Sequence, residues 1–188
     1  DWVDFKGKYY RLKQAKLYVK PTTPVPTYVA SFGPKVAEIA GKYGEGFITA
    51  FLVSEEHLHN VLIPAIERGA KKMGRDPSKI EKVVELDLGY DKDYTKALKK
   101  VRFYAGSMFS VAYKYGVADP REIEQMGNLV GDEQIAQTYA IGTKAEDFIS
   151  RIEKLIKMGF DQVYLVSTSP DEKAFIELCA KEIIPYLK

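Results

Sequence analysis

Short apolar runs alternate with amphipathic helical stretches along this 188-residue chain, and the clearest example lies between Pro26 and Phe51. An apolar run at 27–31 ends in a Ser-Phe-Gly-Pro turn. A helical spacing of apolar residues follows over 34–43, and a second apolar run covers 46–51. Strand, turn, helix and strand in this order form a crossover unit, which requires parallel strands. The pattern therefore predicts an α/β fold.

The same alternation continues to the C-terminus, where further apolar runs predict strands at 81–90 and 162–167. All four strands are mostly continuous apolar runs, as parallel strands covered on both faces should be. The predicted helices cover 54–73, 93–105, 107–117, 120–127, 143–158 and 170–187, and a hairpin or extended excursion covers 4–20. Four βα units with extra helices after the third strand form either a small open sheet or half of an eight-stranded barrel.

The composition excludes several classes of partner. A net charge of +2 gives no general attraction to nucleic acid or to membranes. No apolar run approaches the length of a transmembrane helix and no signal peptide opens the chain, so we expect a soluble, cytoplasmic protein. No His or Cys set has metal-site spacing, and Cys179 lies on an apolar helical stripe typical of a core position. Abundant Lys, Glu and Tyr with scarce Asn and Gln favour a thermophilic source.

The turn after the first core strand has the residue types of an anion site. Gly33 lets a ligand approach the backbone closely, and Pro34 suits the first position of a helix. The N–H groups of Lys35, Val36 and Ala37 would then be free at the helix start, where a phosphate or carboxylate can accept them. The alternative is an ordinary capped loop between a strand and a helix.

Other polar residues fall near the carboxyl ends of predicted strands, where α/β proteins gather their functional groups. Asp87 could contact a cofactor or substrate, and a structural role in capping the next loop is the alternative. Similar rim positions are predicted for Thr49, Tyr90, Ser167 and Thr168.

The remaining candidates are interpreted as structural. His57 and His59 are two residues apart in a helix, so they point to different faces and we expect a surface role for both. The lysine pair Lys99–Lys100 is typical of a solvated helix face. Packing in the core or between subunits is expected for Tyr104, Tyr113 and Tyr115.

Three segments together resemble the bacterial-luciferase-like superfamily, and most of all its coenzyme F420-dependent oxidoreductases, which include methylenetetrahydromethanopterin reductase and sugar-phosphate and alcohol dehydrogenases. The segments are YYRLKQAKLYVKP at 9–21, PVPTYVASFGPKVAEIAGKYGEGFIT at 24–49, and GTKAEDFISRIEKLIKMGFDQVYLVSTSPDEKAFIELCAKEIIPYLK at 142–188. The resemblance covers nearly the whole chain.

The resemblance implies that the chain is the C-terminal half of a TIM (βα)8 barrel, with the fifth to eighth βα units in a single domain at 1–188. The helices at 93–127 correspond to the insertion that the family carries after its seventh strand. In the family, the N-terminal half supplies much of the deazaflavin pocket and the acid/base residues. We therefore expect no complete active site in this chain alone, and no catalytic residue is assigned.

The resemblance also implies hydride transfer between F420 and a small organic substrate, for which a methylene-tetrahydropterin is one candidate. The cofactor's phosphate and tail would be held by Ala30, Ser31, Phe32, Gly33, Pro34, Lys35 and Val36. Phe32 departs from the small residue commoner in the family and could crowd the ligand or stack on it. The lysine that sugar-phosphate enzymes carry after the sixth strand is missing from Ala50–Ser54, which disfavours glucose 6-phosphate.

Two alternatives remain beside this enzyme. One is an FMN-dependent monooxygenase of the luciferase type, since the two cofactors share the fold. The other is a non-catalytic half-barrel that self-associates or binds flavin. A half-barrel leaves two sheet edges and an apolar interior uncovered, so we expect a homo-oligomer such as a homodimer, or association with an N-terminal half.

Overall fold

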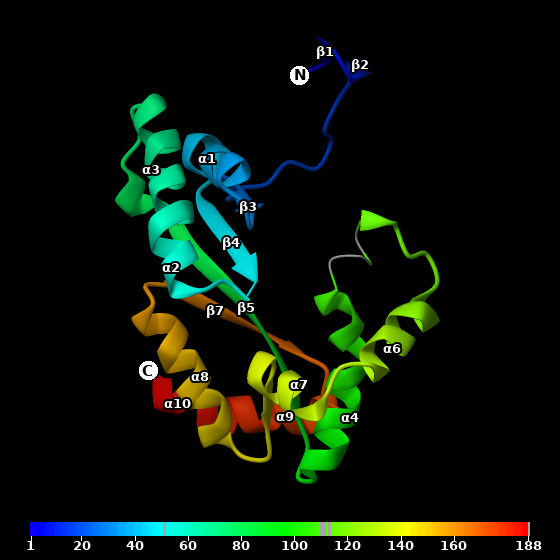
Figure 1. The fold of residues 1–188 in the computed structure, drawn as a ribbon. Coiled ribbons are helices and arrows are strands. Elements are labelled where there is room, and N and C mark those ends of the chain that lie inside the picture. The colour runs from blue at the N-terminus through cyan, green and yellow to red at the C-terminus, as the bar shows by residue number, and fades with distance from the viewer. Residues whose placement is uncertain (51, 110–111, 113, 188) are drawn as a thin grey trace.

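The computed structural model describes residues 1–50, 52–109, 112 and 114–187. The chain opens with an antiparallel hairpin of β1 (Val3–Lys6) and β2 (Arg11–Ala15), which confirms the hairpin predicted at 4–20. Figure 1 shows that this hairpin stands away from the rest of the chain, to which an extended segment connects it.

A parallel sheet forms the centre of the remaining chain. Its strands are β3 (Tyr28–Ala30), β4 (Gly46–Ala50), β5 (Glu81–Tyr90), β6 (Ala140–Gly142) and β7 (Gln162–Ser167). The order is β3-β4-β5-β6, and β7 also pairs with β5. Leu88 pairs with both Ala140 and Ser167, and Val84 pairs with both Thr49 and Val163. The strands β4 and β6 therefore lie along one edge of β5, and β7 lies along the other.

The four predicted strands correspond to β3, β4, β5 and β7. This confirms the α/β fold and the four parallel βα units that make up half of a barrel. The strand predicted at 46–51 ends at Ala50, and Phe51 lies outside the described residues. The three-residue strand β6 was not predicted, because so short a segment next to a helix carries no alternation of its own.

Helices connect these strands. They are α1 (Pro34–Tyr43), α2 (Glu55–His57), α3 (Ile63–Lys72), α4 (Tyr94–Ala105), α6 (Pro120–Asn128), α7 (Asp132–Thr138), α8 (Ala145–Lys157), α9 (Glu172–Leu178) and α10 (Ile184–Leu187). The helix predicted at 120–127 extends to Asn128 as α6, and the short helix α7 was not predicted. The helix predicted at 107–117 falls partly outside the described residues.

Two of the predicted helices contain a π-helical turn. The helix predicted at 54–73 widens at Leu58–Leu62, and the one at 170–187 widens at Cys179–Ile183. Each wide turn comes just before a proline, Pro64 or Pro185. A proline has no N–H and its ring crowds the preceding helical turn, so local widening lets the helix direction continue through it.

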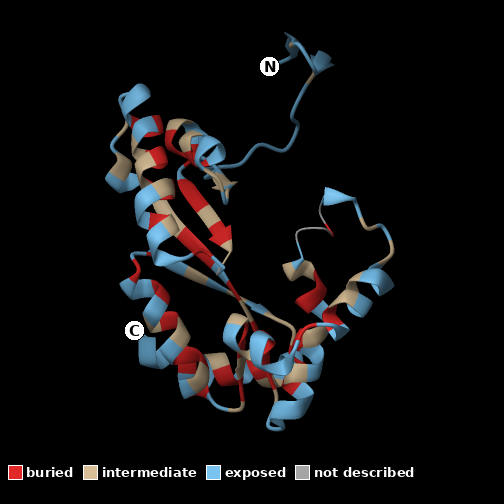
Figure 2. Ribbon diagram, in the orientation of Figure 1, coloured by how far each residue is buried: buried red, intermediate tan, exposed pale blue. Residues whose placement is uncertain are grey.

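The two faces of the sheet are unequal. Helices α1, α3, α8 and α9 cover one face, and Val84, Leu86 and Leu88 of β5 pack into the core beneath them. The opposite face, here called the open face, carries Glu85 and Asp87 of β5 beside Tyr164 and Val166 of β7. Tyr164 is 44% exposed and Val166 is 42% exposed. Figure 2 shows the buried positions concentrated between the sheet and its helices.

The helices that follow β5 form a second core. Val101 and Ala105 of α4 pack with Ile135 of α7 and with Tyr139. Arg102 of α4 donates hydrogen bonds to the carbonyl oxygens of Gly127 and Val130, at 3.3 and 2.6 Å. These contacts hold α4, α6 and α7 together beside the carboxyl end of β5.

Helices α1 and α3 approach each other at two glycines. A Cβ atom added at Gly41 would overlap the carbonyl oxygen of Ile66, and one added at Gly69 would overlap that of Glu38. Neither contact can be relieved by rotating a side chain, because both obstacles are backbone atoms. The helix pair that covers β3 and β4 therefore depends on these two glycines.

The Gly69→Ala substitution should destabilise the chain by about 2 kcal/mol, because the added methyl group forces the two helices apart. The measurement is the midpoint of chemical denaturation followed by circular dichroism. Gly131→Ala is the control, since its Cβ would meet no atom within 4 Å; because Gly131 is the N-cap residue of α7, it should lose about 0.5 kcal/mol, well below the loss in Gly69→Ala. Equal stability of the two variants would contradict the close packing of α1 on α3.

Candidate functional site

The turn between β3 and α1 is held in place by backbone and side-chain hydrogen bonds. Ser31 N donates to the carbonyl oxygen of Ile48 on β4, at 2.9 Å. The Ser31 hydroxyl donates to the carbonyl oxygen of Gly33, at 2.8 Å. These two bonds fix the chain direction between the end of the strand and the start of the helix.

The N-terminus of α1 carries no side-chain cap. Gly33 is the N-cap residue, with φ −130° and ψ 157°, and Pro34 is the first helical residue, as predicted. The N–H of Ala37, expected to be free, instead donates to the Gly33 carbonyl oxygen at 3.0 Å. Within the described residues, the N–H groups of Lys35 and Val36 have no acceptor. A Cβ at Gly33 would meet no atom within 4 Å, so there is open space in front of these donors.

A histidine contacts this turn, and sequence reasoning missed it. The His57 ring stacks on Phe32 with centroids 5.5 Å apart and planes 25° apart. His57 Nε2 lies 2.9 Å from the Phe32 carbonyl oxygen, so this nitrogen donates the bond. Ser54 accepts from His57 N at 3.1 Å and fixes the start of α2. The bulky Phe32 is thus held by His57, whereas His59 is exposed on another face.

Asp87 lies on the open face, next to a second carboxylate. Glu85 is two residues away on the same face of β5, and Asp87 pairs in register with Val166. Burial, followed by the charge of Glu85, raises the pKa of the Asp87 carboxyl above its ordinary value. No hydrogen-bond donor to this carboxylate lies among the described residues. Asp87 therefore caps no loop among the described residues, and its surroundings disfavour the ionised carboxylate.

Two predicted rim residues lie away from the open face. Thr49 pairs with Val84 and points into the covered core, where its side chain is 5% exposed and its hydroxyl has no partner among the described residues. The Tyr90 ring packs between Phe148 and Phe175, with both centroid distances 6.2 Å. Both are therefore interior residues, and we assign neither to a ligand.

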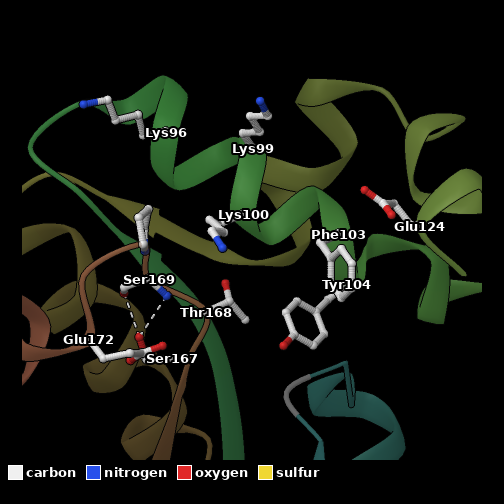
Figure 3. Close-up of a pocket in the computed structure, with 11 residues that line it drawn as sticks. Lys96, Lys99, Lys100, Phe103, Tyr104, Glu124, Ser167, Thr168, Ser169 and Glu172 are labelled. Carbon is white, nitrogen blue, oxygen red and sulfur yellow. Dashed lines mark hydrogen bonds between the residues drawn. The ribbon is translucent and has the colours of Figure 1, made fainter. Parts of the chain in front are cut away.

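Ser167 and Thr168 lie where β7 ends, as predicted. The Thr168 hydroxyl donates to the carbonyl oxygen of Leu88 at 3.1 Å and so connects the ends of β7 and β5. A cavity opens beside these residues, and Tyr104 and Lys100 of α4 also line it (Figure 3). Lys99 and Lys100 are exposed on α4, as expected of a solvated helix face, and they also line this cavity.

The remaining candidates are placed as follows. Cys179 is half-buried against the core, and burial raises the pKa of its thiol, which makes it a poor nucleophile. Tyr115 is 71% exposed, and Tyr113 lies outside the described residues.

The described part of the chain holds no group of three or more His, Cys, Asp or Glu residues that could bind a metal ion. None of its helices has the length and hydropathy needed to cross a bilayer.

Comparison with known proteins gives a family and several relatives. The profile of the luciferase-like monooxygenases matches residues 1–162. F420-dependent glucose-6-phosphate dehydrogenases from Mycobacterium leprae and Mycobacterium avium are each 34% identical over 188 residues. Each match covers 100% of this chain and 56% of the relative, so the chain spans about half the length of the curated relatives it matches.

Solved structures give the same result. An F420-dependent secondary alcohol dehydrogenase, in complex with an F420–acetone adduct, is 39% identical with a TM-score of 0.86, over 100% of this chain and 56% of that one. The coenzyme F420-dependent tetrahydromethanopterin reductase from Methanopyrus kandleri is 24% identical with a TM-score of 0.74, over 99% and 58%. At that lower identity the reductase shows the fold alone.

The Asp87→Asn variant should be more stable than the parent chain at pH 7, because the raised pKa means that folding disfavours the ionised carboxylate. Below pH 3.8, the pKa of Asp87 in the unfolded chain, the carboxyl is protonated in both states and the parent loses no stability. The parent becomes less stable than the variant as the pH rises through the pKa of Asp87 in the folded chain. The difference in thermal midpoint should therefore close as the pH is lowered to about 3.5.

The Glu85→Gln background is the control for this measurement. Removal of the neighbouring charge should shrink the gain from Asp87→Asn without abolishing it, since burial is the larger cause. A variant less stable than its parent at pH 7 would show instead that the Asp87 carboxylate has a stabilising partner.

Proposed function

The chain belongs to the luciferase-like monooxygenase family, and on that basis we propose that it forms part of an F420-dependent oxidoreductase. The reaction would transfer a hydride between the deazaflavin ring of F420 and a small organic substrate. The observation that carries the proposal is the match along the whole chain to an F420-dependent alcohol dehydrogenase, together with the unoccupied donors at the start of α1.

The residues of the turn fit an anionic cofactor tail. The N–H groups of Lys35 and Val36 face open space, and the positive end of the dipole of α1, a ten-residue helix, lies behind them. Gly33 leaves room for a phosphate or carboxylate to reach both donors, and the Lys35 side chain adds a positive charge. Ser31 holds the turn in shape through its bond to the Gly33 carbonyl oxygen.

The cofactor supplies the hydride chemistry, and this chain supplies binding and orientation. Phe32, held against His57, limits the space beside the tail. The open face forms one wall of the site, with Asp87 and Glu85 as its polar groups. A protein segment packed on the open face would bury the exposed Tyr164 and Val166. This segment would be a second copy of the chain or four further βα units.

The substrate that we favour is a small alcohol or carbonyl compound, and a methylene-tetrahydropterin is a second candidate. The absence of a lysine from Ala50–Ser54 argues against a sugar phosphate, although the curated relatives carry that activity. The helices at 93–127 would then be an insertion within a single domain.

An FMN-dependent monooxygenase and a half-barrel without turnover are the competing functions. The monooxygenases among the solved structures are below 20% identical, so they support the fold and not the cofactor. The exposed open face favours association with another protein segment. Both a catalytic and a non-catalytic half-barrel require such association, so it does not distinguish between them.

The test is a titration of this chain with F420 and with FMN, followed by fluorescence anisotropy. F420 should bind saturably and more tightly than FMN. Gly33→Asp should weaken F420 binding about tenfold or more, because an N-cap carboxylate accepts the Lys35 and Val36 donors itself and repels an anion.

Gly33→Ala is the matched control, since it adds a methyl group in open space and leaves both donors free, and it should bind F420 within about threefold of the parent. Gly33→Asp should also raise the thermal midpoint, because it caps α1, so that lost binding cannot be attributed to unfolding. Tighter binding of FMN, or equal F420 binding by all three proteins, would overturn the proposal.

A further inference from the structure

A cavity of about 520 Å³ lies where β7 ends, between α4 and the loop that leads to α9. Figure 3 shows Lys100, Phe103 and Tyr104 on the α4 side and Thr168 on the opposite side. It is separate from the turn before α1, which follows β3 at the other edge of the sheet. The carboxyl ends of parallel strands are the usual place for ligands in α/β proteins, so this cavity has the location of a binding site.

Three unpaired lysines lie along this cavity. Lys99 and Lys100 follow Lys96 by three and four residues, so each lies beside Lys96 on the same side of α4. None of them takes part in an ion pair within the described residues. In Figure 3 the Lys100 ammonium group reaches toward Thr168, whereas Lys96 and Lys99 extend outward. Lys100 is therefore the cation available to a ligand inside the cavity, and the other two add positive potential at its rim.

Two acidic residues also line the cavity, and they do not neutralise Lys100. Glu124 of α6 and Glu172 of α9 are both exposed, and neither forms an ion pair with a lysine. Figure 3 places them on opposite sides of the cavity, away from Lys100. Their carboxylates would repel a ligand that carries negative charge along its whole length. They therefore favour a ligand with a single anionic group at one end.

The hydroxyl groups in the cavity leave one hydrogen without an acceptor. Ser169 is 6% exposed, and its Oγ accepts from Tyr90 N at 3.0 Å and from Ser167 Oγ at 2.7 Å. Ser167 Oγ in turn accepts from Ser169 N at 3.1 Å. The two serines carry two hydroxyl hydrogens and use one between them, so the other is left to donate. A buried donor without an acceptor is costly, and a ligand oxygen would satisfy it.

Aromatic side chains form the apolar part of the lining. Phe103 is 42% exposed and Tyr104 is 50% exposed, and their rings meet edge to face at 5.2 Å. Neighbouring aromatic rings of this kind bind flat apolar groups, because such groups gain both burial and ring contact.

We propose that this cavity binds an organic anion composed of a flat apolar body and one phosphate or carboxylate group. The anionic group accepts from the Lys100 ammonium and from the spare serine hydroxyl, and the flat body lies against Phe103 and Tyr104. The proposal concerns a site other than the turn at Gly33, and it does not depend on the identity of the cofactor.

The experiment is calorimetric titration of the 188-residue chain with phenyl phosphate, which carries both a ring and an anion. Inorganic phosphate and phenol, each lacking one of these parts, should bind about tenfold more weakly. Lys100→Gln should weaken phenyl phosphate binding about fivefold or more, and Lys100→Arg should keep it within about threefold, because the charge remains. Phe103→Ala should weaken phenyl phosphate without changing inorganic phosphate.

Lys71→Gln is the matched control, because Lys71 lies on α3, does not line the cavity, and forms no ion pair with any residue that the structure describes. It should bind phenyl phosphate within about twofold of the parent chain. An equal loss in Lys71→Gln and Lys100→Gln, or inorganic phosphate binding as tightly as phenyl phosphate, would mean non-specific charge attraction and would overturn the proposal.

Gly33→Asp separates this site from the cofactor turn. Phenyl phosphate affinity should be unchanged in that variant, even where F420 binding is lost. Loss of phenyl phosphate binding in Gly33→Asp with retention in Lys100→Gln would place the anion at the turn. That result would overturn the second site and leave the proposed function intact.

Discussion

The fold depends on the pairing of one strand, β5, with three others. Its ten residues pair with β4 and β6 along one edge and with β7 along the other, and β3 joins only through β4. Alternation along β5 then sets the two faces, since Leu86 packs under the helices while Glu85 and Asp87 point the opposite way. A shift of one residue in this strand would exchange the core for the polar groups, so register and function are determined together.

Much of the fold could be predicted because the signals are local. The bounds predicted for α1 and β5 agree with the structure, since Pro34 and Gly44 mark the helix ends and an apolar run marks the strand. The strand β6 carries no such signals, and α7 is only seven residues long, with just Gly131 and two acidic residues to mark its start. Ala140–Gly142 becomes a strand only because the end of β5 offers it a partner, and that partner is about fifty residues away in the sequence.

The candidate site could be predicted less well, because it depends on contacts between distant segments. The residue types of Ser31–Pro34 indicated the turn, but the stacking of His57 on Phe32 joins residues that are 25 positions apart. Thr49 was expected at a rim because it lies near the end of its strand, yet its register with Val84 turns it into the core. The end of a strand can be predicted from the sequence. The face of the sheet on which a residue near that end lies depends on the register between the strand and its neighbours.

Two outer strands of the sheet, β3 and β7, differ in the number of residues that they offer to a further strand. β3 offers three residues for pairing, while β7 offers six, with Tyr164 and Val166 exposed beside them. A newly arriving parallel strand forms about twice as many backbone hydrogen bonds on β7 as on β3. A partner strand would therefore be held more firmly at β7 than at β3, so the turn holding Gly33 lies beside the more weakly paired edge.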